Sequence, residues 1–434
     1  MKIALIGSGA REHIIAEQLA RSPQCDQLYV FGNTLNPGIE PLAARYHVGN
    51  LTDTKAIQAF VDEYRPDFAV VGPEAPLAAG VVDALLEIGI PSASPTQAMA
   101  QLESSKGFTR ELLEKYGISG NPEFKVFTSP DGLKEFAESL GQIVVKADGL
   151  HGGKGVLVQG DHFETIDQGV EQARAFLKSD GQVVIEEKLV GQEFSLMSFV
   201  DGDHVIDMLP IQDHKRAYEN DQGPNTGGMG TYSDRENLPF LEASDLTAAH
   251  QITVETAAAL KKELGTGFKG IMYGGFMAVK NGVRLIEYNA RFGDPEVMNA
   301  LTLLKTDLVE VCLAIIHGTL DQLNIEFEKK ATVCKYIVPK GYPENPVKGE
   351  RIHQTKAFQG VGVYYASVEA AGDDWVLGGS RAMAFVAKAD TLEEAEKNVQ
   401  KAVESIQGPI FFRRDIGTKT LIDQRIEMMR ALRK

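Results

Sequence analysis

The chain has 434 residues, of which 43% are hydrophobic and 24% are charged, an ordinary composition for a globular protein of about two to four domains. Its formal net charge of −16 argues against nucleic acid or an anionic membrane as a partner. The charge does not exclude a phosphorylated substrate, because local lysines and arginines can form a positive pocket in an acidic protein.

The spacing of the cysteines and the length of the apolar runs indicate where in the cell the protein is expected. Cys25, Cys312 and Cys334 are widely spaced and form no CxxC pair, so we expect them to be reduced. No apolar run approaches the ~18 residues that a transmembrane helix needs. The opening MKIALIGSGAREH is expected to form a core strand rather than a signal peptide. We therefore expect a cytoplasmic protein without a membrane partner.

Strand and helix patterns alternate over the first hundred residues. We expect strands at 3–6, 28–31 and 68–71, and helices at 11–21 and 81–86. Such alternation predicts a parallel sheet with helices on both faces, a Rossmann-like α/β domain over residues 1–101. Pro91 and Pro95 close this domain, and a new helix begins near Thr96.

The middle of the chain, residues 102–325, has a mixed pattern. Strands at 143–146 and 156–159 flank a glycine-rich loop, and a helix at 164–177 and a strand at 183–187 follow. The runs FSLMSFV and VIDMLPI predict a hairpin around the turn Asp201-Gly202-Asp203. Residues 212–232 are rich in Gly, Asn, Asp and Pro and predict a functional loop of about 20 residues.

The last part of the chain, residues 326–434, predicts a smaller α+β domain. Strands are expected at 332–338, 362–368 and 382–387. A helix is expected from Thr391 to about Ile406, because Thr391 and Glu394 form a capping box before an apolar stripe.

The segment LIEYNARFGDPE, residues 285–296, is the most informative motif. Its alternation predicts a strand with Leu285, Glu287, Asn289 and Arg291 on one face and Ile286, Tyr288 and Ala290 on the other. Oxygen ligands from Glu and Asn suit a hard cation such as Mg²⁺, and an adjacent Arg suits an anion. A metal beside an anion is typical of phosphoryl transfer, whereas a solvated polar face is the plainer alternative.

Weaker motifs also predict anion sites. The loop GSGAREH, between a strand and a helix, suits a phosphate, but Glu12 replaces the third glycine of a dinucleotide fingerprint. Lys146, Lys154 and the glycines between them can cover a triphosphate or form an ordinary hairpin. Glu186 and Glu187 end a strand at a candidate adenine hinge, and Glu74 lies in a turn where α/β sheets bind ligands. A solvated acidic turn and a structural turn are the respective alternatives.

The order of these motifs along the chain is more specific than any one of them. The series GSGAREH, GPEAPL, the glycine hairpin, QDHKR, GPNTGGMG, RFGDPE and FFRRDIG closely resembles the glycinamide ribonucleotide synthetase family, ATP-grasp enzymes of purine biosynthesis. The resemblance runs from residue 1 to about 418. It implies a pre-ATP-grasp domain, an ATP-grasp domain with a mobile lid over about 121–187, and a C-terminal domain.

The resemblance also implies roles for individual residues. ATP would contact Lys106, Lys146, Gly152, Gly153, Lys154, Gly155, Glu186, Glu187, Leu189 and Glu193. Mg²⁺ or Mn²⁺ would be held by Glu287 and Asn289. The catalytic residues would be Arg291, Asp294, Asp213 and Lys215. Phosphoribosylamine would meet Gly9, Arg11, Glu12 and Glu74, and glycine would lie near Asn225, Thr226, Gly227, Met229 and Gly293.

The implied reaction activates a carboxylate. Glycine would attack the γ-phosphorus of ATP, and the amine of 5-phosphoribosylamine would then attack the resulting glycyl phosphate. Such chemistry needs charge neutralisation and a closing lid more than a covalent catalyst. ATP, glycine and phosphoribosylamine are the expected partners, together with transient contact with the enzyme that supplies the amine.

The chain departs from the family pattern in three places. It has FGNTLNPGIE where the family has a PGNAGT-like segment, His151-Gly152 where two alanines are usual, and Lys188 at a usually aromatic position. Three alternatives remain open: another ATP-grasp ligase with a different small carboxylate, an NAD-dependent oxidoreductase, and a non-catalytic ATP-binding protein.

Overall fold

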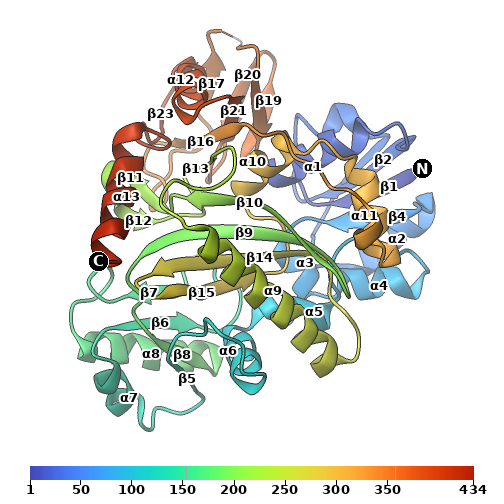
Figure 1. Ribbon diagram of the computed structural model, residues 1–434. Coiled ribbons are helices and arrows are strands. Elements are labelled where there is room, and N and C mark those ends of the chain that lie inside the picture. Colours follow the sequence, from blue (N-terminus) through green and yellow to red (C-terminus); the bar gives the residue numbers. More distant parts are fainter. Residues whose placement is uncertain (153, 357) are drawn as a thin grey trace.

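The computed structural model describes residues 1–152, 154–356 and 358–434 (Figure 1). Its N-terminal part is a parallel sheet in the order β3-β2-β1-β4, which confirms the expected Rossmann-like arrangement. The apolar strands are buried because helices cover them. The elements are β1 (Lys2–Ile6), β2 (Gln27–Gly32), β3 (Arg45–Val48), β4 (Phe68–Val71), α1 (Ala10–Ala20), η1 (Glu40–Leu42), α2 (Thr54–Tyr64), α3 (Glu74–Ala78) and α4 (Val81–Glu87).

A small antiparallel sheet follows two connecting helices, α5 (Gln97–Ser104) and α6 (Lys106–Lys115). Its strand order is β5-β8-β6-β7, and it lies at the lower left of Figure 1. The elements are β5 (Phe124–Phe127), α7 (Leu133–Leu140), β6 (Ile143–Ala147), β7 (Val156–Val158), α8 (Ile166–Asp180) and β8 (Val183–Glu187). Phe127, Ile143, Val145 and Ile185 belong to an apolar core separate from the main core. We call this unit the lid.

A long sheet in the order β15-β14-β9-β10-β13-β16-β21-β18 forms the body of the protein. It continues across residue 326, so strands of the ATP-grasp part and of the C-terminal part share one ladder. The strands are β9 (Gln192–Asp201), β10 (Val205–Asp213), β13 (Gly230–Ser233), β14 (Lys269–Val279), β15 (Gly282–Asn289), β16 (Ala331–Pro339), β18 (Val361–Tyr365) and β21 (Met383–Ala389).

Helices and small ladders surround this sheet (Figure 1). The helices are α9 (Ala243–Leu264), α10 (Glu296–Leu303), α11 (Leu308–His317), η3 (Leu320–Gln322), α12 (Leu392–Val403) and α13 (Lys419–Leu432). The remaining C-terminal strands are β17 (Arg351–Gln354), β19 (Val368–Ala371), β20 (Asp374–Leu377), β22 (Ile406–Gln407) and β23 (Ile410–Phe411). No helix among the described residues is long and apolar enough to cross a membrane.

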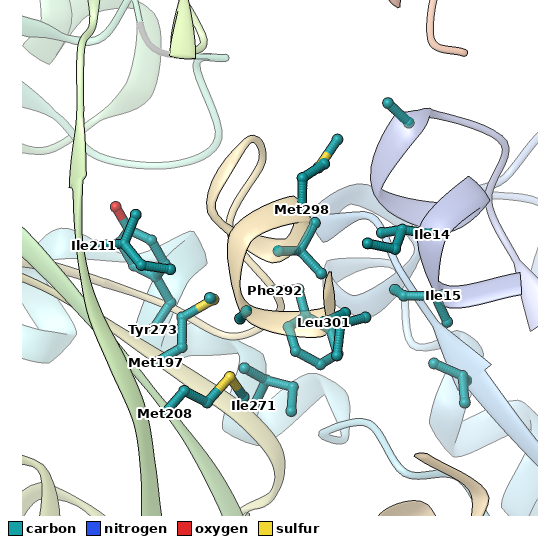
Figure 2. Packing of buried hydrophobic residues seen from close by; sticks show 14 of the residues in the cluster. Ile14, Ile15, Met197, Met208, Ile211, Ile271, Tyr273, Phe292, Met298 and Leu301 are labelled. Carbon is teal, nitrogen blue, oxygen red and sulfur yellow. The ribbon is translucent and has the colours of Figure 1, made fainter. Parts of the chain in front are cut away.

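Helix α10 joins the N-terminal part to the body. Figure 2 shows its residues Met298 and Leu301 between Ile14 of α1 and the sheet residues Met197 and Ile211. All of these side chains are buried. Because α10 begins at Glu296, directly after the RFGDP turn, this packing fixes the turn relative to both neighbours.

The segment 212–232 is not a single loop, so that expectation is wrong. It contains β11 (Arg216–Tyr218), η2 (Glu219–Asp221), β12 (Gln222–Asn225) and most of β13. Strand β13 pairs with β10 on one side and β16 on the other. Hydrogen bonding to two neighbours holds this short run as a strand despite its glycine-rich surroundings.

The expected alternation along 285–291 is also wrong in detail. The register of β15 against β14 shifts between Gly275 and Phe276, which leaves Ile286 unpaired. Because of this bulge, Leu285 and Tyr288 both point into the core, and Leu285 does not share a face with Glu287 as expected. The strand ends at Asn289, so Arg291 lies in the turn that follows.

The separate core of the lid leads to a testable prediction. Ile143→Ala removes a fully buried side chain and is expected to destabilise the lid by about 2–5 kcal/mol. In hydrogen exchange monitored by mass spectrometry, peptides from 124–187 should lose protection while peptides from β1 and β4 keep it. Equal loss of protection along the whole chain would contradict an independently folded lid.

Candidate active site

A cavity of about 830 Å³ lies where the lid, the body and the two terminal parts meet. The N-terminal part contributes Arg11 and Glu74, the lid contributes Lys146, β15 contributes Glu287, and the C-terminal part contributes Arg381. Every part of the fold therefore supplies at least one charged side chain to the same space.

Most of the residues predicted from the sequence line this cavity. Those that line it are Arg11, Glu74, Lys106, Lys146, Gly152, Gly155, Glu186, Glu187, Leu189, Glu193, Asp213, Lys215, Asn225, Thr226, Gly227, Glu287, Asn289, Arg291, Gly293 and Asp294. Four predicted residues are not part of the lining: Gly9, Glu12, Lys154 and Met229. Gly153 lies outside the described residues.

The carboxylate of Glu12 caps the helix that begins after Gly9, and neither Gly9 nor Glu12 is part of the cavity lining. The Gly9 N–H donates to Glu12 Oε2 (2.7 Å), and Arg11 Nε donates to Glu12 Oε1 (2.6 Å). The Glu12 side chain thus closes the N-terminus of α1. Met229 is likewise buried, and its N–H donates to the carbonyl of His214.

A buried ion cluster joins the lid to the body. Lys146 Nζ lies 2.8 Å from Glu186 Oε2, and Arg110 donates to both oxygens of Glu186 at 2.6 and 2.9 Å. Lys146 and Arg110 also both donate to the carbonyl of Ile286 (2.7 Å each). Burial alone would raise the pKa of Glu186, but Arg110 and Lys146 outweigh it and lower that pKa. The carboxylate of Glu186 is therefore engaged by cations, and only its backbone is left for an adenine.

Polar contacts also hold the glycine loop and the hinge of the lid. Lys106 Nζ donates to the carbonyl of Gly149 (3.0 Å), which connects α6 to the loop. His151 Nε2 lies 3.1 Å from Asp180 Oδ2. Lys188 Nζ donates to the carbonyl of Gln159 (2.6 Å). The departures at His151 and Lys188 thus form contacts within the lid.

The segment FGNTLNPGIE, which departs from the family pattern, is held in place by the hydrogen bonds of the buried Asn36. Asn36 Nδ2 donates to the carbonyls of Ser8 (2.9 Å) and Tyr365 (2.7 Å), and its Oδ1 accepts from the Gly38 N–H (2.9 Å). The segment therefore links the N-terminal glycine loop to the C-terminal part.

Glu287 and Asn289 present oxygen atoms to the cavity. Within the described part of the chain, the Glu287 carboxylate has no hydrogen-bonding partner, and Asn289 Oδ1 accepts only a long bond from Arg291 Nη2 (3.3 Å). Burial would raise the pKa of Glu287, but Lys215, Lys146 and other cations lower it. An ionised carboxylate beside an amide oxygen is a donor set that fits Mg²⁺ or Mn²⁺.

This pair could not complete a metal site alone. The described residues hold no cluster of three or more His, Cys, Asp or Glu side chains suited to a metal ion. A cation at Glu287 and Asn289 would take its other ligands from water and phosphate oxygens, as is usual for Mg²⁺.

Arg291 turns toward the N-terminal part of the protein. Its Nη2 lies 2.9 Å from Glu103 Oε1, and its Nε lies 3.4 Å from Glu74 Oε2. Arg11 Nη2 approaches the same oxygen of Glu74 at 3.7 Å. Burial would raise the pKa of Glu74, but Arg291 and Arg11 outweigh it and lower the pKa to about 2. The polar side chains predicted at positions 287, 289 and 291 are therefore connected to Glu74 through Arg291.

Two further carboxylates of the cavity lining are Asp213 and Glu296. Tyr273 Oη donates to Glu296 Oε1 (2.8 Å). Burial, together with the neighbouring Glu296, raises the pKa of Asp213 well above its usual value. Glu193 is the strongest influence on Lys215 and raises the pKa of that lysine. Asp213 and Glu296 form a protonatable pair beside a cation.

Sequence reasoning missed several residues of this site. Arg110 follows Lys106 by four residues on α6, a spacing that places both on one helix face and was available as a signal. Glu103 and Tyr273 are recognised only when distant elements come together. Glu296 is part of the RFGDPE motif, but its contact with Tyr273 carries no sequence signal. Arg381, in GGSRAMA, carries no sequence signal at all.

A lid sheet facing an antiparallel body sheet, with the buried Lys146 between them and the acid–amide pair of Glu287 and Asn289 in the cavity lining, defines an ATP-grasp enzyme. Family models of the phosphoribosylglycinamide synthetase N domain, ATP-grasp (A) domain and C domain match residues 1–103, 104–297 and 332–419. The chain belongs to the phosphoribosylglycinamide synthetase family.

Full-length relatives and solved structures agree with this assignment. The chain is similar to the phosphoribosylamine–glycine ligases of Methanocella arvoryzae (45% identical) and Methanocaldococcus jannaschii (46%), with all of each chain covered. The crystal structure of the phosphoribosylamine–glycine ligase of Thermotoga maritima matches with a TM-score of 0.80 at 26% identity, over 96% of this chain and 100% of that one. A biotin carboxylase domain from Hydrogenobacter thermophilus shares the fold, with a TM-score of 0.73 at 15% identity, over 99% and 93%.

The ion cluster yields a prediction about stability and nucleotide binding. Glu186→Ala leaves Lys146 and Arg110 buried without their carboxylate and should lower the free energy of unfolding by about 3–5 kcal/mol. The affinity for ATP should fall as well, because Lys146 loses its fixed position. Denaturant unfolding and ATP titration measure the two effects.

Glu171→Ala is the matched control, because it removes an exposed carboxylate of the same lid that pairs with Arg174. It should change the free energy of unfolding by less than about 1 kcal/mol. Equal behaviour of the two variants would contradict the role given to the cluster.

Proposed function

We propose that the protein ligates glycine to 5-phosphoribosylamine with consumption of ATP, giving glycinamide ribonucleotide, ADP and phosphate in purine biosynthesis. The observation that carries the proposal is the joint presence in one cavity of Lys146, Glu287, Asn289, Asp213 and Arg291. The full-length relatives named as phosphoribosylamine–glycine ligases support the same reaction.

ATP would lie between the lid and the body. Lys106 and Lys146 would neutralise phosphate charge, and the backbone of the strand end at 186–189 would meet the adenine. Mg²⁺ or Mn²⁺ would be held by Glu287 and Asn289. The bound cation would offset the charge that develops on the transferring phosphoryl group. The ionised Glu287 carboxylate, which lacks a partner in the described chain, supports this assignment.

Glycine would be activated beside Arg291. One carboxylate oxygen of glycine attacks the γ-phosphorus as the bond from that phosphorus to the bridging oxygen breaks, so ADP leaves and glycyl phosphate forms. Arg291 and Lys215 would offset the negative charge. Carbonyl and carboxylate oxygens near Gly227 and Asp213 would accept hydrogen bonds from the ammonium group of glycine.

The second step forms the amide bond. The amine of phosphoribosylamine attacks the acyl carbon. The bond between that carbon and the oxygen that links it to phosphorus breaks, and phosphate leaves as the amine loses a proton. We propose that Arg11 and Glu74 hold the amino sugar, which is supported by their approach to Arg291. A closing lid would protect the acyl phosphate from water.

We propose boundaries at 1–101, 102–325 and 326–434 for the three domains, with the lid over about 121–187. The separate apolar core of the lid supports this division. We further propose a cytoplasmic location, which the three free cysteines support.

Phosphate release tests the function directly. Purified protein is supplied with ATP, Mg²⁺, glycine and freshly generated phosphoribosylamine, and each component is omitted in turn. The proposal expects release only when all four are present. Release that depends on another amino acid instead of glycine would assign the fold to a different carboxylate–amine ligase.

The metal assignment yields a separate prediction. Glu287→Ala removes the anionic anchor and should lower kcat by at least about a hundredfold, with weaker Mn²⁺ binding in electron paramagnetic resonance. Glu236→Ala removes a carboxylate that is 79% exposed and serves as the control. Normal activity and normal Mn²⁺ binding of Glu287→Ala at saturating metal would refute the assignment.

A further inference from the structure

Arg381 enters the cavity from the C-terminal part of the fold, directly before β21. Its backbone is fixed within the long sheet: the Ala382 N–H donates to the carbonyl of Ile337, and the Ser367 N–H donates to the carbonyl of Arg381 (2.9 Å each). The guanidinium carbon lies 4.4 Å from the centroid of the Tyr336 ring. With 15% of its side chain exposed, Arg381 is held by its backbone hydrogen bonds and by the ring of Tyr336.

The guanidinium of Arg381 connects two segments that line the cavity. Nη1 donates to the carbonyls of Gly227 (2.7 Å), Gly228 (3.0 Å) and Asp294 (3.1 Å). Nη2 lies 3.2 Å from Asp294 Oδ2, and Tyr336 Oη donates to Asp294 Oδ1 (2.7 Å). One side chain thus links the GPNTGGMG segment to the RFGDPE turn.

Backbone hydrogen bonds hold the residues on either side of the two glycines: the Thr226 N–H donates to the carbonyl of Lys215, and the Met229 N–H donates to the carbonyl of His214 (2.8 Å each). Gly228 has a φ of +107°, and a Cβ there would lie 2.7 Å from Asp213 Oδ1. A side chain at position 228 would therefore collide with the carboxylate of Asp213. The Thr226 hydroxyl adds a bond to the carbonyl of Lys215 (2.8 Å) and accepts from the Gly228 N–H (3.0 Å). Glycines contribute no side chains of their own and are costly to order.

We propose that Arg381 is a positioning residue for the carboxylate substrate, acting through the carbonyls of Gly227 and Gly228 and through Asp294. The inference rests on the proposed function, which places glycine among these groups. Arg381 contacts none of the groups assigned to ATP, so its removal should disturb glycine use and spare nucleotide binding. A planar fork that reaches several oxygens is a property of arginine that lysine does not share.

The test compares Arg381→Gln and Arg381→Lys with the wild type. The KM for glycine, the KM for ATP, kcat and the melting temperature are measured for each. Arg381→Gln should raise the KM for glycine, or lower kcat/KM for glycine, by at least about tenfold, with the KM for ATP within about twofold. Arg381→Lys keeps the charge beside Asp294, so its KM for glycine should lie between those of the wild type and Arg381→Gln. Arg351→Gln, an exposed residue of the C-terminal part paired with Asp374, is the control.

The outcomes separate the inference from the proposed function. Dependence of the wild type on glycine is measured first, and its absence would refute the proposed function. If the wild type needs glycine, unchanged glycine kinetics in Arg381→Gln would overturn the inference. Equal losses toward ATP and glycine, or unfolding of both Arg381 variants, would also overturn it, because they would mark Arg381 as a purely structural residue.

Discussion

A buried lysine can present its charge to a phosphate only if the protein compensates that charge in the absence of ligand. Lys146 is compensated by Glu186, 2.8 Å away, which is itself shared with Arg110. Burial still lowers the pKa of Lys146, and the Glu186 carboxylate opposes that shift. Because Lys146 is part of the lid and Arg110 is part of α6, the cluster also fixes the lid relative to that helix. The shared carbonyl of Ile286 extends the constraint to β15, the strand that carries Glu287. The phosphate contact that we propose for Lys146 and the attachment of the lid therefore depend on the same ions.

The long sheet explains how distant parts of the sequence serve one reaction. Strand β10 ends at Asp213, and β13, β16 and β21 follow it in the ladder. Arg381 thus reaches the carbonyl of Gly227 from a position 154 residues further along the chain. A net charge of −16 is compatible with phosphate chemistry because cations such as Arg11, Lys106 and Lys146 are gathered in one cavity.

The sequence predicted the fold class, and most of the residues that it singled out line the cavity, because strand patterns and glycine loops are local signals. It could not predict the bulge at Ile286, which depends on the register of β15 against β14. It assigned Glu186 to adenine, since the pairing of that carboxylate with Arg110 arises only when α6 meets β8. Arg381 was missed for the same reason, because its partners lie on other strands and turns.

The central claim is that the cavity activates the carboxylate of glycine as an acyl phosphate. Glycine labelled with ¹⁸O in both carboxylate oxygens tests it most directly, with mass analysis of the phosphate released alongside glycinamide ribonucleotide. The account predicts one ¹⁸O atom in each phosphate, because the attacking oxygen stays on phosphorus when the amine displaces it. Product formation with unlabelled phosphate would contradict the account.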